Sequence, residues 1–288
     1  MSSIKTINCA VIIAIWLSAI YGYTGEEATP LDNNKEPVEE TKAREARIWF
    51  LGHCGFALKT PSYFLIFDYI EATRSKRYQW HEDSILSTGY IDPEEIKDLK
   101  VRVFTTHEHE DHFDPAIFKW ESQIADIEYF FGWQASDNPE YHYLLGSRAV
   151  WQCEDLEVYT IKSNHAGVPE VAYLVKVDGL VIYHNGDYQG DYEDDITYLK
   201  TKADSIDIAF LFCVWQAQWK YYRVNFELIT RMQPKAAFPM HVRIGDEDDY
   251  FEPFRSTYEP MMQGGRVVLT YNTRGISFYY NRDQITQD

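Results

Sequence analysis

The heptapeptide THEHEDH at residues 106–112 contains three of the nine histidines in this 288-residue chain. In an extended segment, side chains two positions apart face the same way, so His107 and His109 can bind one metal ion together. The turn that follows brings Asp111 and His112 toward a second position. Imidazole and carboxylate groups are ligands of zinc, iron and manganese. A polar surface loop with unrelated histidines is the alternative, but the spacing HxHxDH at a strand end favours a metal site.

The chain around this heptapeptide alternates between strand-like and helix-like segments. Residues 101–105 form an apolar run typical of a buried strand, while Asp92-Pro93 and Asp114-Pro115 each combine a helix N-cap with a proline of the first turn. Further apolar runs predict strands at residues 48–51, 56–59, 64–67, 156–161, 171–177, 180–183, 206–213 and 235–240, with a helix near residues 225–232. This order predicts one α/β domain of two sheets with helices outside.

Three connections carry more specific expectations. The dipeptide Asp178-Gly179 predicts a tight hairpin between two of the strands. Two final runs, residues 267–271 and 276–280, are expected to pair as a hairpin over the four residues between them. Residues 121–153 lack a clear periodicity and are expected to hold an irregular insertion.

Beyond the heptapeptide, the chain resembles the metallo-β-lactamase superfamily. The family signature corresponds to HxHxDH at residues 107–112, its third histidine to His165, its bridging aspartate to Asp187 and its last histidine to His241. These residues occur in the family's order, and the resemblance covers nearly the whole chain after Ile48. Taken singly, each later residue has an ordinary interpretation as a half-buried histidine or a turn aspartate. Each nevertheless follows a predicted strand, so all can meet at one edge of a sandwich.

This resemblance implies both the fold and the metal ligands. The fold is an αββα four-layer sandwich, and the site binds two divalent metal ions, with zinc preferred and manganese or iron as alternatives. One ion would be held by three histidines and the other by an aspartate and two histidines, with Asp187 between them. The expected ligands are His107, His109 and His165 for the first ion, and Asp111, His112 and His241 for the second.

The chemistry implied by such a site is hydrolysis. Two divalent ions about 3.5–4 Å apart would share a bridging hydroxide and stabilise the charge that develops on the substrate oxygen. Catalytic roles are expected for Asp111, Asp187 and His53. His53 would bind substrate or protonate the leaving group, with packing inside the first hairpin as the alternative. Asp68 would hydrogen-bond the histidine loop. Cys54 is not expected to act with His53, because neighbouring side chains in a strand point to opposite faces.

Two further segments resemble one subgroup of this superfamily. The segment LGHCGF at residues 51–56 and the segment FPMH at residues 238–241 are similar to those of ascorbate-phosphate lactonases and N-acyl-phosphatidylethanolamine phospholipases. The narrower resemblance implies cleavage of an ester, lactone or phosphodiester bond in a small molecule or lipid. The segment VRIGDED that follows His241 is not a pattern associated with either of these activities, which leaves the substrate open. A non-catalytic exported metal-binding protein is the alternative, and the complete set of seven ligands argues against it.

The N-terminal residues 1–22 have the features of a signal peptide. Lys5 is their only charge, and residues 9–20 are almost entirely apolar, which is short for a membrane span of about 20 residues. An uncleaved membrane anchor is the alternative. Residues 23–46 predict an acidic flexible linker, and the hydrolase domain is expected to span residues 47–288. We therefore expect an extracytoplasmic protein, periplasmic or secreted, without stable membrane insertion after cleavage.

The charge balance restricts the class of partner. The chain has 27 Lys and Arg against 45 Asp and Glu, a formal net charge of −18. Nucleic-acid binding relies on clustered basic side chains, so nucleic acid is not an expected partner. The sequence also lacks a GxSxG elbow, a P-loop and a GxGxxG motif. The expected partner is a small-molecule or lipid substrate, and the sequence gives no indication of an oligomeric state.

Overall fold

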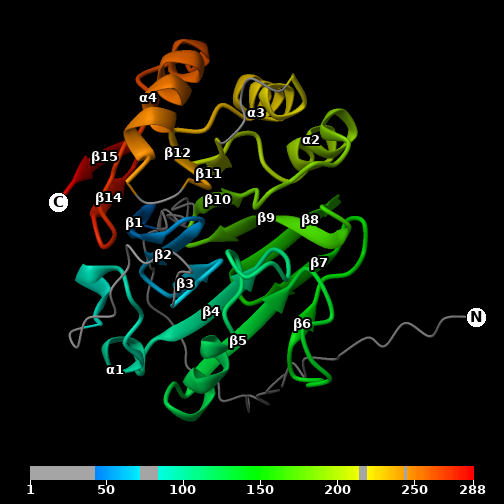
Figure 1. The fold of residues 1–288 in the computed structure, drawn as a ribbon, viewed down its shortest axis with the longest axis vertical. Coiled ribbons are helices and arrows are strands. Elements are labelled where there is room, and N and C mark those ends of the chain that lie inside the picture. Colours follow the sequence, from blue (N-terminus) through cyan, green and yellow to red (C-terminus); the bar gives the residue numbers. More distant parts are fainter. Residues whose placement is uncertain (1–42, 72–83, 214–218, 243–244) are drawn as a thin grey trace, which may run out of the picture. The chain divides into compact units, whose positions relative to one another are not determined.

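The computed structural model describes residues 43–71, 84–213, 219–242 and 245–288. The expected signal peptide and most of the expected linker lie outside these ranges. The described chain forms two sheets that pack face to face, with helices on the outer faces (Figure 1). The expected αββα sandwich is therefore confirmed.

The first sheet has eight strands in the order β15-β14-β1-β2-β3-β4-β5-β6. Their bounds are β1 Glu45–Gly52, β2 Gly55–Lys59, β3 Phe64–Phe67, β4 Lys100–Thr105, β5 Asp126–Phe131, β6 His142–Tyr143, β14 Ser277–Asn281 and β15 Gln284–Gln287. Strands β1 and β2 form an antiparallel hairpin, whereas β3, β4 and β5 are parallel. The segments that follow the parallel strands therefore meet at one edge of the sheet.

The second sheet has seven strands in the order β13-β12-β11-β10-β9-β8-β7. Their bounds are β7 Val150–Cys153, β8 Leu156–His165, β9 Val168–Val177, β10 Leu180–His184, β11 Ile208–Phe212, β12 Ala236–Met240 and β13 Val267–Val268. Strands β10, β11 and β12 are parallel, so their following segments also share one edge. The hairpin predicted at Asp178-Gly179 joins β9 to β10, and both turn residues have positive φ, 49° and 76°.

Within the residues that the structure describes, four α-helices and three 3-10 helices flank the sandwich. Their bounds are α1 Pro93–Ile96, α2 Tyr192–Lys200, α3 Trp219–Met232, α4 Glu247–Tyr258, η1 Leu86–Thr88, η2 Pro115–Ser122 and η3 Glu259–Met261. In Figure 1, α2, α3 and α4 flank the second sheet and α1 lies beside the first. The carboxylates of Asp92 and Asp114 cap α1 and η2, as predicted. Helices α2 and α4 were not predicted. Within the described ranges, no helix is both long enough and apolar enough to cross a membrane.

The core lies on both faces of the first sheet. Along β1, Ile48 and Phe50 belong to the core between the sheets, while Trp49 and Leu51 belong to the core under α1, η1 and η2. Successive side chains of a strand point to opposite faces, so a strand buried on both sides has a continuous apolar sequence. The layered fold therefore explains why the predicted strands are almost uninterrupted apolar runs.

The structure corrects one expectation about connections and qualifies another. The runs at residues 267–271 and 276–280 do not pair: β13 lies beside β12 in the second sheet, and β14 lies beside β1 in the first. Residues 121–153 contain irregular stretches, but they also supply β5, β6 and β7 to the two sheets. In both cases the chain crosses from one sheet to the other. Local sequence patterns indicate strand character but do not identify the partner strand, which is chosen by long-range packing.

Candidate metal centre

The predicted site residues lie in six segments at the ends of strands. These segments are the turn between β1 and β2, the residues after β3, the heptapeptide after β4, the end of β8, and the residues after β10 and β12. The functional side chains that they carry are His53, Asp68, His107, His109, Asp111, His112, His165, Asp187 and His241. The structure brings all of these segments to the same place.

The first group of donors contains His107, His109 and His165. One ligand atom from each lies within 4.8 Å of the other two. Nε2 of His107 is 3.0 Å from Nδ1 of His109, and the amide of Gln189 contacts Nδ1 of His165. The three histidines expected to share one ion are therefore neighbours, although β8 is far from the heptapeptide in the sequence.

Hydrogen bonds set the tautomer of His107. The hydroxyl of Thr106 donates to Oδ2 of Asp68 at 2.8 Å, so its oxygen is left to accept from Nδ1 of His107 at 3.1 Å. Nε2 then carries the free lone pair that faces His109. Burial, with a smaller effect of His112, lowers the pKa of His107 to about 2. This ring is neutral at ordinary pH and is ready to act as a ligand.

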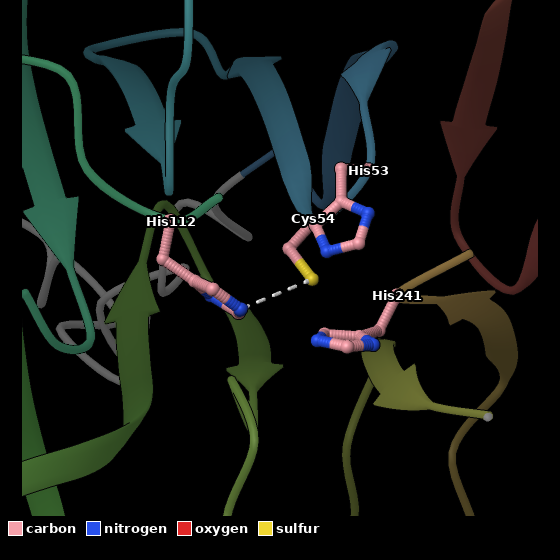
Figure 2. Close-up of side chains that lie close together, drawn as sticks. All are labelled: His53, Cys54, His112 and His241. Carbon is pink, nitrogen blue, oxygen red and sulfur yellow. Dashed lines mark hydrogen bonds between the residues drawn. The ribbon is translucent and has the colours of Figure 1, made fainter. Parts of the chain in front are cut away.

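The second group of donors contains His53, Cys54, His112 and His241, which Figure 2 shows pointing toward one another. Their ligand atoms also lie within 4.8 Å of one another. Nδ1 of His112 donates to Oδ2 of Asp68 at 2.7 Å, and Nδ1 of His53 donates to the carbonyl of residue 242 at 3.1 Å. In each neutral ring Nε2 is then the acceptor nitrogen.

Asp187 lies between the two groups. Its Oδ2 atom is 3.1 Å from Nε2 of His165 and 3.1 Å from Nε2 of His241, and its Oδ1 atom is 3.3 Å from Nε2 of His112. The backbone amide of Asp187 donates to Oε1 of Glu170 at 2.5 Å, which fixes the direction of the side chain. One carboxylate therefore contacts histidines of both groups, as the resemblance implies.

Asp111 occupies the margin of the cluster. Its Oδ2 atom is 3.3 Å from Nε2 of His53 and 3.9 Å from Nε2 of His241, and its side chain is 48% exposed. Among the described residues, no group of three mutually close donors includes Asp111. Although burial opposes the shift, the hydrogen bond from His53 and the charge of His112 lower the pKa of Asp111. Its carboxylate is thus ionised and partly open to solvent.

The electrostatics of the cluster favour neutral rings at His165 and His241, a protonated ring at His112 and an ionised carboxylate at Asp187. Burial is the main cause that lowers the pKa of both His165 and His241. Although burial opposes the shift, His112 and His241 hold the pKa of Asp187 well below its usual range. The pKa of His112 is raised, because Cys54 and Asp187 outweigh the opposing effect of burial. The proton on His112 thus provides, in the absence of a metal ion, the positive charge that a bound metal ion would bring to this part of the cluster.

The residues of the cluster fit divalent metal ions. Oδ1 of Asp187 and Nδ1 of His241 are buried, and none of the described residues forms a hydrogen bond with either atom. Burial of an unsatisfied polar atom costs about 1–3 kcal/mol, and a bound cation would remove that cost at the carboxylate. His53, Asp68 and His241 all have a left-handed backbone, with φ of 50°, 42° and 68°. Such strained residues concentrate at functional sites.

Sequence reasoning missed two buried residues of the site. Glu170 accepts from the hydroxyl of Ser163 and the amide of Asp187, and its Oε1 atom is 3.6 Å from Nδ1 of His107. Burial, reinforced by the charge of Asp187, raises the pKa of Glu170 to about 8. The signal for Glu170 was available, because it is the only carboxylate in the strand Val168–Val177, which is apolar apart from Glu170 and Lys176.

The second missed residue is Cys54. The expectation that it points away from His53 was wrong, because its premise of a strand was wrong. Gly52 pairs with Gly55 across the hairpin, so His53 and Cys54 are the two central residues of a tight turn. In this turn both side chains reach the same cluster (Figure 2).

Comparisons with known proteins agree with the fold. The family described as "Beta-lactamase superfamily domain" matches residues 47–241. Among solved structures, a metallo hydrolase from the archaeon Ignicoccus hospitalis is 15% identical, with a TM-score of 0.58, over 83% of this chain and 99% of that chain. A candidate metal-dependent hydrolase from Parabacteroides distasonis is 17% identical, with a TM-score of 0.52, over 80% and 94%.

The same fold also occurs in proteins with other chemistry. A diiron β-hydroxylase from Streptomyces venezuelae is 10% identical, with a TM-score of 0.57, over 85% of this chain and 55% of that chain. No curated protein sequence matches the chain. The structural neighbours share the fold, and the family match extends over more than half of the sequence. The chain therefore belongs to the metallo-β-lactamase superfamily.

Proposed function

We propose that this protein is an exported, binuclear metal-dependent hydrolase. It would cleave an ester, lactone or phosphodiester bond of a small molecule or lipid. His107, His109 and His165 would hold one divalent ion. His112 and His241 would hold the other, with Asp111 beside it. Divalent ions in these positions would lower the pKa of a water molecule to near neutrality and polarise the substrate oxygen.

The position of Asp187 is the observation that carries this proposal. Its Oδ2 atom has the same distance, 3.1 Å, to Nε2 of His165 in one donor group and to Nε2 of His241 in the other. A carboxylate that serves only one group would have no reason to approach both. The shared carboxylate is what a two-ion centre requires, because it holds the ions close to one another and offsets their charge.

His53 and Asp111 are placed to move a proton. Nδ1 of His53 is engaged with a backbone carbonyl, so Nε2 is the atom that exchanges a proton, and it lies 3.3 Å from Oδ2 of Asp111. The partly exposed carboxylate of Asp111 connects this nitrogen with solvent. We assign His53 the protonation of the leaving group at Nε2, with the carboxylate of Asp111 orienting the ring and solvent returning the proton.

The bond type and the site of action rest on sequence features. The turn sequence LGHCGF and the ending FPMH support a lactone or phosphodiester substrate through their subgroup resemblance. The apolar run near the N-terminus supports export. N-terminal sequencing of the protein recovered from outside the cytoplasm checks export, since cleavage near residue 22 is expected and an intact N-terminus would contradict it.

The test of the proposed activity combines metal analysis with hydrolysis. The purified protein is stripped with a chelator, reloaded separately with zinc, manganese or iron, and supplied with aryl ester, lactone and bis-aryl phosphodiester substrates. Two ions per chain and turnover on one class are expected. His109→Ala should lose one ion and the turnover. The matched control is His142→Ala, because His142 bonds Glu128 outside the cluster.

Each failure has a distinct meaning. Two ions per chain without turnover on any substrate class would favour the non-catalytic metal-binding alternative. Absence of bound metal under every loading condition would overturn the proposed centre. Turnover that survives both chelation and His109→Ala would show that the hydrolysis does not use this cluster.

A further inference from the structure

We propose that Cys54 is a thiolate ligand of the second metal ion, together with His112 and His241. This half of the centre would then be a mixed sulfur and nitrogen site rather than one built from imidazole and carboxylate alone. The inference rests on the proposed binuclear function and adds a residue to it.

The distances fit direct ligation. Sγ of Cys54 is 3.8 Å from Nε2 of His112, a contact drawn as the dashed line in Figure 2. Zinc binds sulfur at about 2.3 Å and nitrogen at about 2.0–2.1 Å, so two such ligands on one tetrahedral ion are separated by roughly 3.5 Å. Because the nitrogen of His241 lies in the same mutually close group, one ion can bind all three with little movement of the backbone.

The turn between β1 and β2 holds the thiol in this position. Nε2 of the buried His184 donates to the carbonyl of Cys54 at 2.9 Å, and Nδ1 of the same ring accepts from the amide of Gly186 at 3.2 Å. Both nitrogens of His184 are thus occupied, which excludes it as a ligand and makes it a support for Cys54. The opposite side of the turn is fixed by the amide of His241, which donates to the carbonyl of His53 at 3.3 Å.

The partners of the thiol also fit a ligand. Nδ1 of His112 donates to Asp68, which turns Nε2, the remaining ligand atom of the ring, toward Cys54. On binding a divalent ion, a coordinating thiol loses its proton to solvent, and its sulfur lone pair binds the metal.

A second buried cysteine provides the comparison within the same chain. Cys213 follows β11 and is as deeply buried as Cys54. Among the described residues, no group of mutually close donors includes Cys213. Because both positions are buried, packing alone explains why each holds a cysteine. Of these two cysteines, only Cys54 lies close to histidine nitrogens.

The experiment replaces the native ions with cobalt(II) and records the near-ultraviolet spectrum. A thiolate ligand gives an intense sulfur-to-cobalt charge-transfer band, whereas imidazole and carboxylate ligands do not. We expect the band in the protein with two bound cobalt ions. We expect its loss in Cys54→Ser and in Cys54→Ala, and its retention in Cys213→Ser.

The affinity for zinc supplies a second readout. In Cys54→Ser, one of the two ions should bind at least about tenfold more weakly, since even outer partners of ligands change metal affinity about 10–100-fold. The other ion should be little affected. Manganese prefers oxygen ligands, so its affinity should fall less than that of zinc. Equal losses of zinc and manganese would contradict sulfur ligation.

The outcomes separate this inference from the proposed function. Two bound cobalt ions and turnover without the band would overturn the inference and leave the hydrolase intact. Persistence of the band in a folded Cys54→Ser protein would also overturn it. Absence of bound metal would overturn both proposals. If both Cys54 variants fail to fold, the test uses a protein in which Cys54 is the only cysteine that remains. Its cobalt(II) form should show the charge-transfer band, and a spectrum without the band would refute ligation by Cys54.

Discussion

The two donor groups of the centre differ in how the chain assembles them. The first contains only nitrogen donors, and two of its three histidines lie two positions apart in one heptapeptide. The second draws on three separate segments, the β1–β2 turn, the heptapeptide and the residue after β12, and it contains a thiol. In addition, His53 and His241 hold a left-handed backbone in the second group. The first group thus depends largely on local spacing in the sequence. The second group forms only when distant segments come together in the folded sandwich.

The largest effect is expected from a substitution that weakens metal binding by both donor groups at once. Asp187→Asn keeps the size of the side chain but removes the charge that both groups share. We expect both ions to bind weakly and the hydrolysis rate to fall by more than about 100-fold. Loss of a residue that only hydrogen-bonds a metal ligand costs about 10–100-fold, and Asp187 contacts ligands of both ions directly. Metal content and turnover measure this. Asp194→Asn, an exposed change of the same type in α2, is the control. Retention of both ions in Asp187→Asn would disprove the shared role.

Single ligand changes should separate the groups. His109→Ala is expected to lose the first ion and keep the second, and His241→Ala should give the reverse, because their ligand atoms belong to different groups. Metal stoichiometry gives one ion in each variant. The cobalt charge-transfer band tells them apart, since it should persist in His109→Ala and be lost in His241→Ala. Loss of both ions in each variant would mean that the two groups bind cooperatively as one unit.

A smaller and more selective effect is expected from Asp68→Asn. Asp68 accepts from Nδ1 of His112 at 2.7 Å and from the amide and hydroxyl of Thr106 at 2.8 Å each. Its charge orients a ligand of the second group directly and His107 of the first group only through Thr106. We expect activity to fall by about 10–100-fold, with a larger loss of affinity for the second ion. Competition with a metal indicator measures both affinities, and a larger loss at the first ion would contradict this order.

The smallest effects should come from added methyl groups. In Gly186→Ala the new Cβ would lie 2.8 Å from Oγ1 of Thr106, close to the first group, at a backbone φ of 52°. In Gly55→Ala it would lie 3.0 Å from the carbonyl of Gly52, inside the turn of the second group. Overpacking of this kind costs about 1–3 kcal/mol of unfolding free energy. Each variant should weaken mainly its own group, as measured by zinc affinity together with thermal unfolding. Equal losses of zinc affinity at both ions would contradict the separation of the centre into two donor groups.

The sequence predicted most of the sandwich because its strands are buried on both faces. Continuous apolar runs such as residues 101–105 and 235–240 correspond to β4 and β12. The wrong expectations concern pairing: β13 and β14 are close in sequence and lie in different sheets. The segment that crosses between them is anchored by the amide of Gly275, which donates to the carbonyl of Phe50. Such long-range bonds leave no local pattern.

The same limit applies to the centre. The three histidines of the heptapeptide were recognisable because their spacing is local. Cys54 was missed because its direction depends on a two-residue turn at the end of β1, whereas the expectation treated His53 and Cys54 as neighbours within a strand. Glu170 was missed because its partners, Ser163 and the amide of Asp187, meet it only after β8, β9 and β10 have paired. Residues that support ligands are thus harder to find than the ligands themselves.

The bonds between the β1–β2 turn and the end of β12 also affect how the chain folds. The hydrogen bond from His53 to residue 242 joins positions 189 apart in the sequence, so the loop that it closes has a large entropic cost. Contacts of such high sequence separation form late in folding. An ion held by both segments would act as a reversible crosslink, worth about 2.7 kcal/mol at a free metal concentration one hundred times its Kd. Metal supply would thereby set the unfolding free energy of the chain as well as its activity.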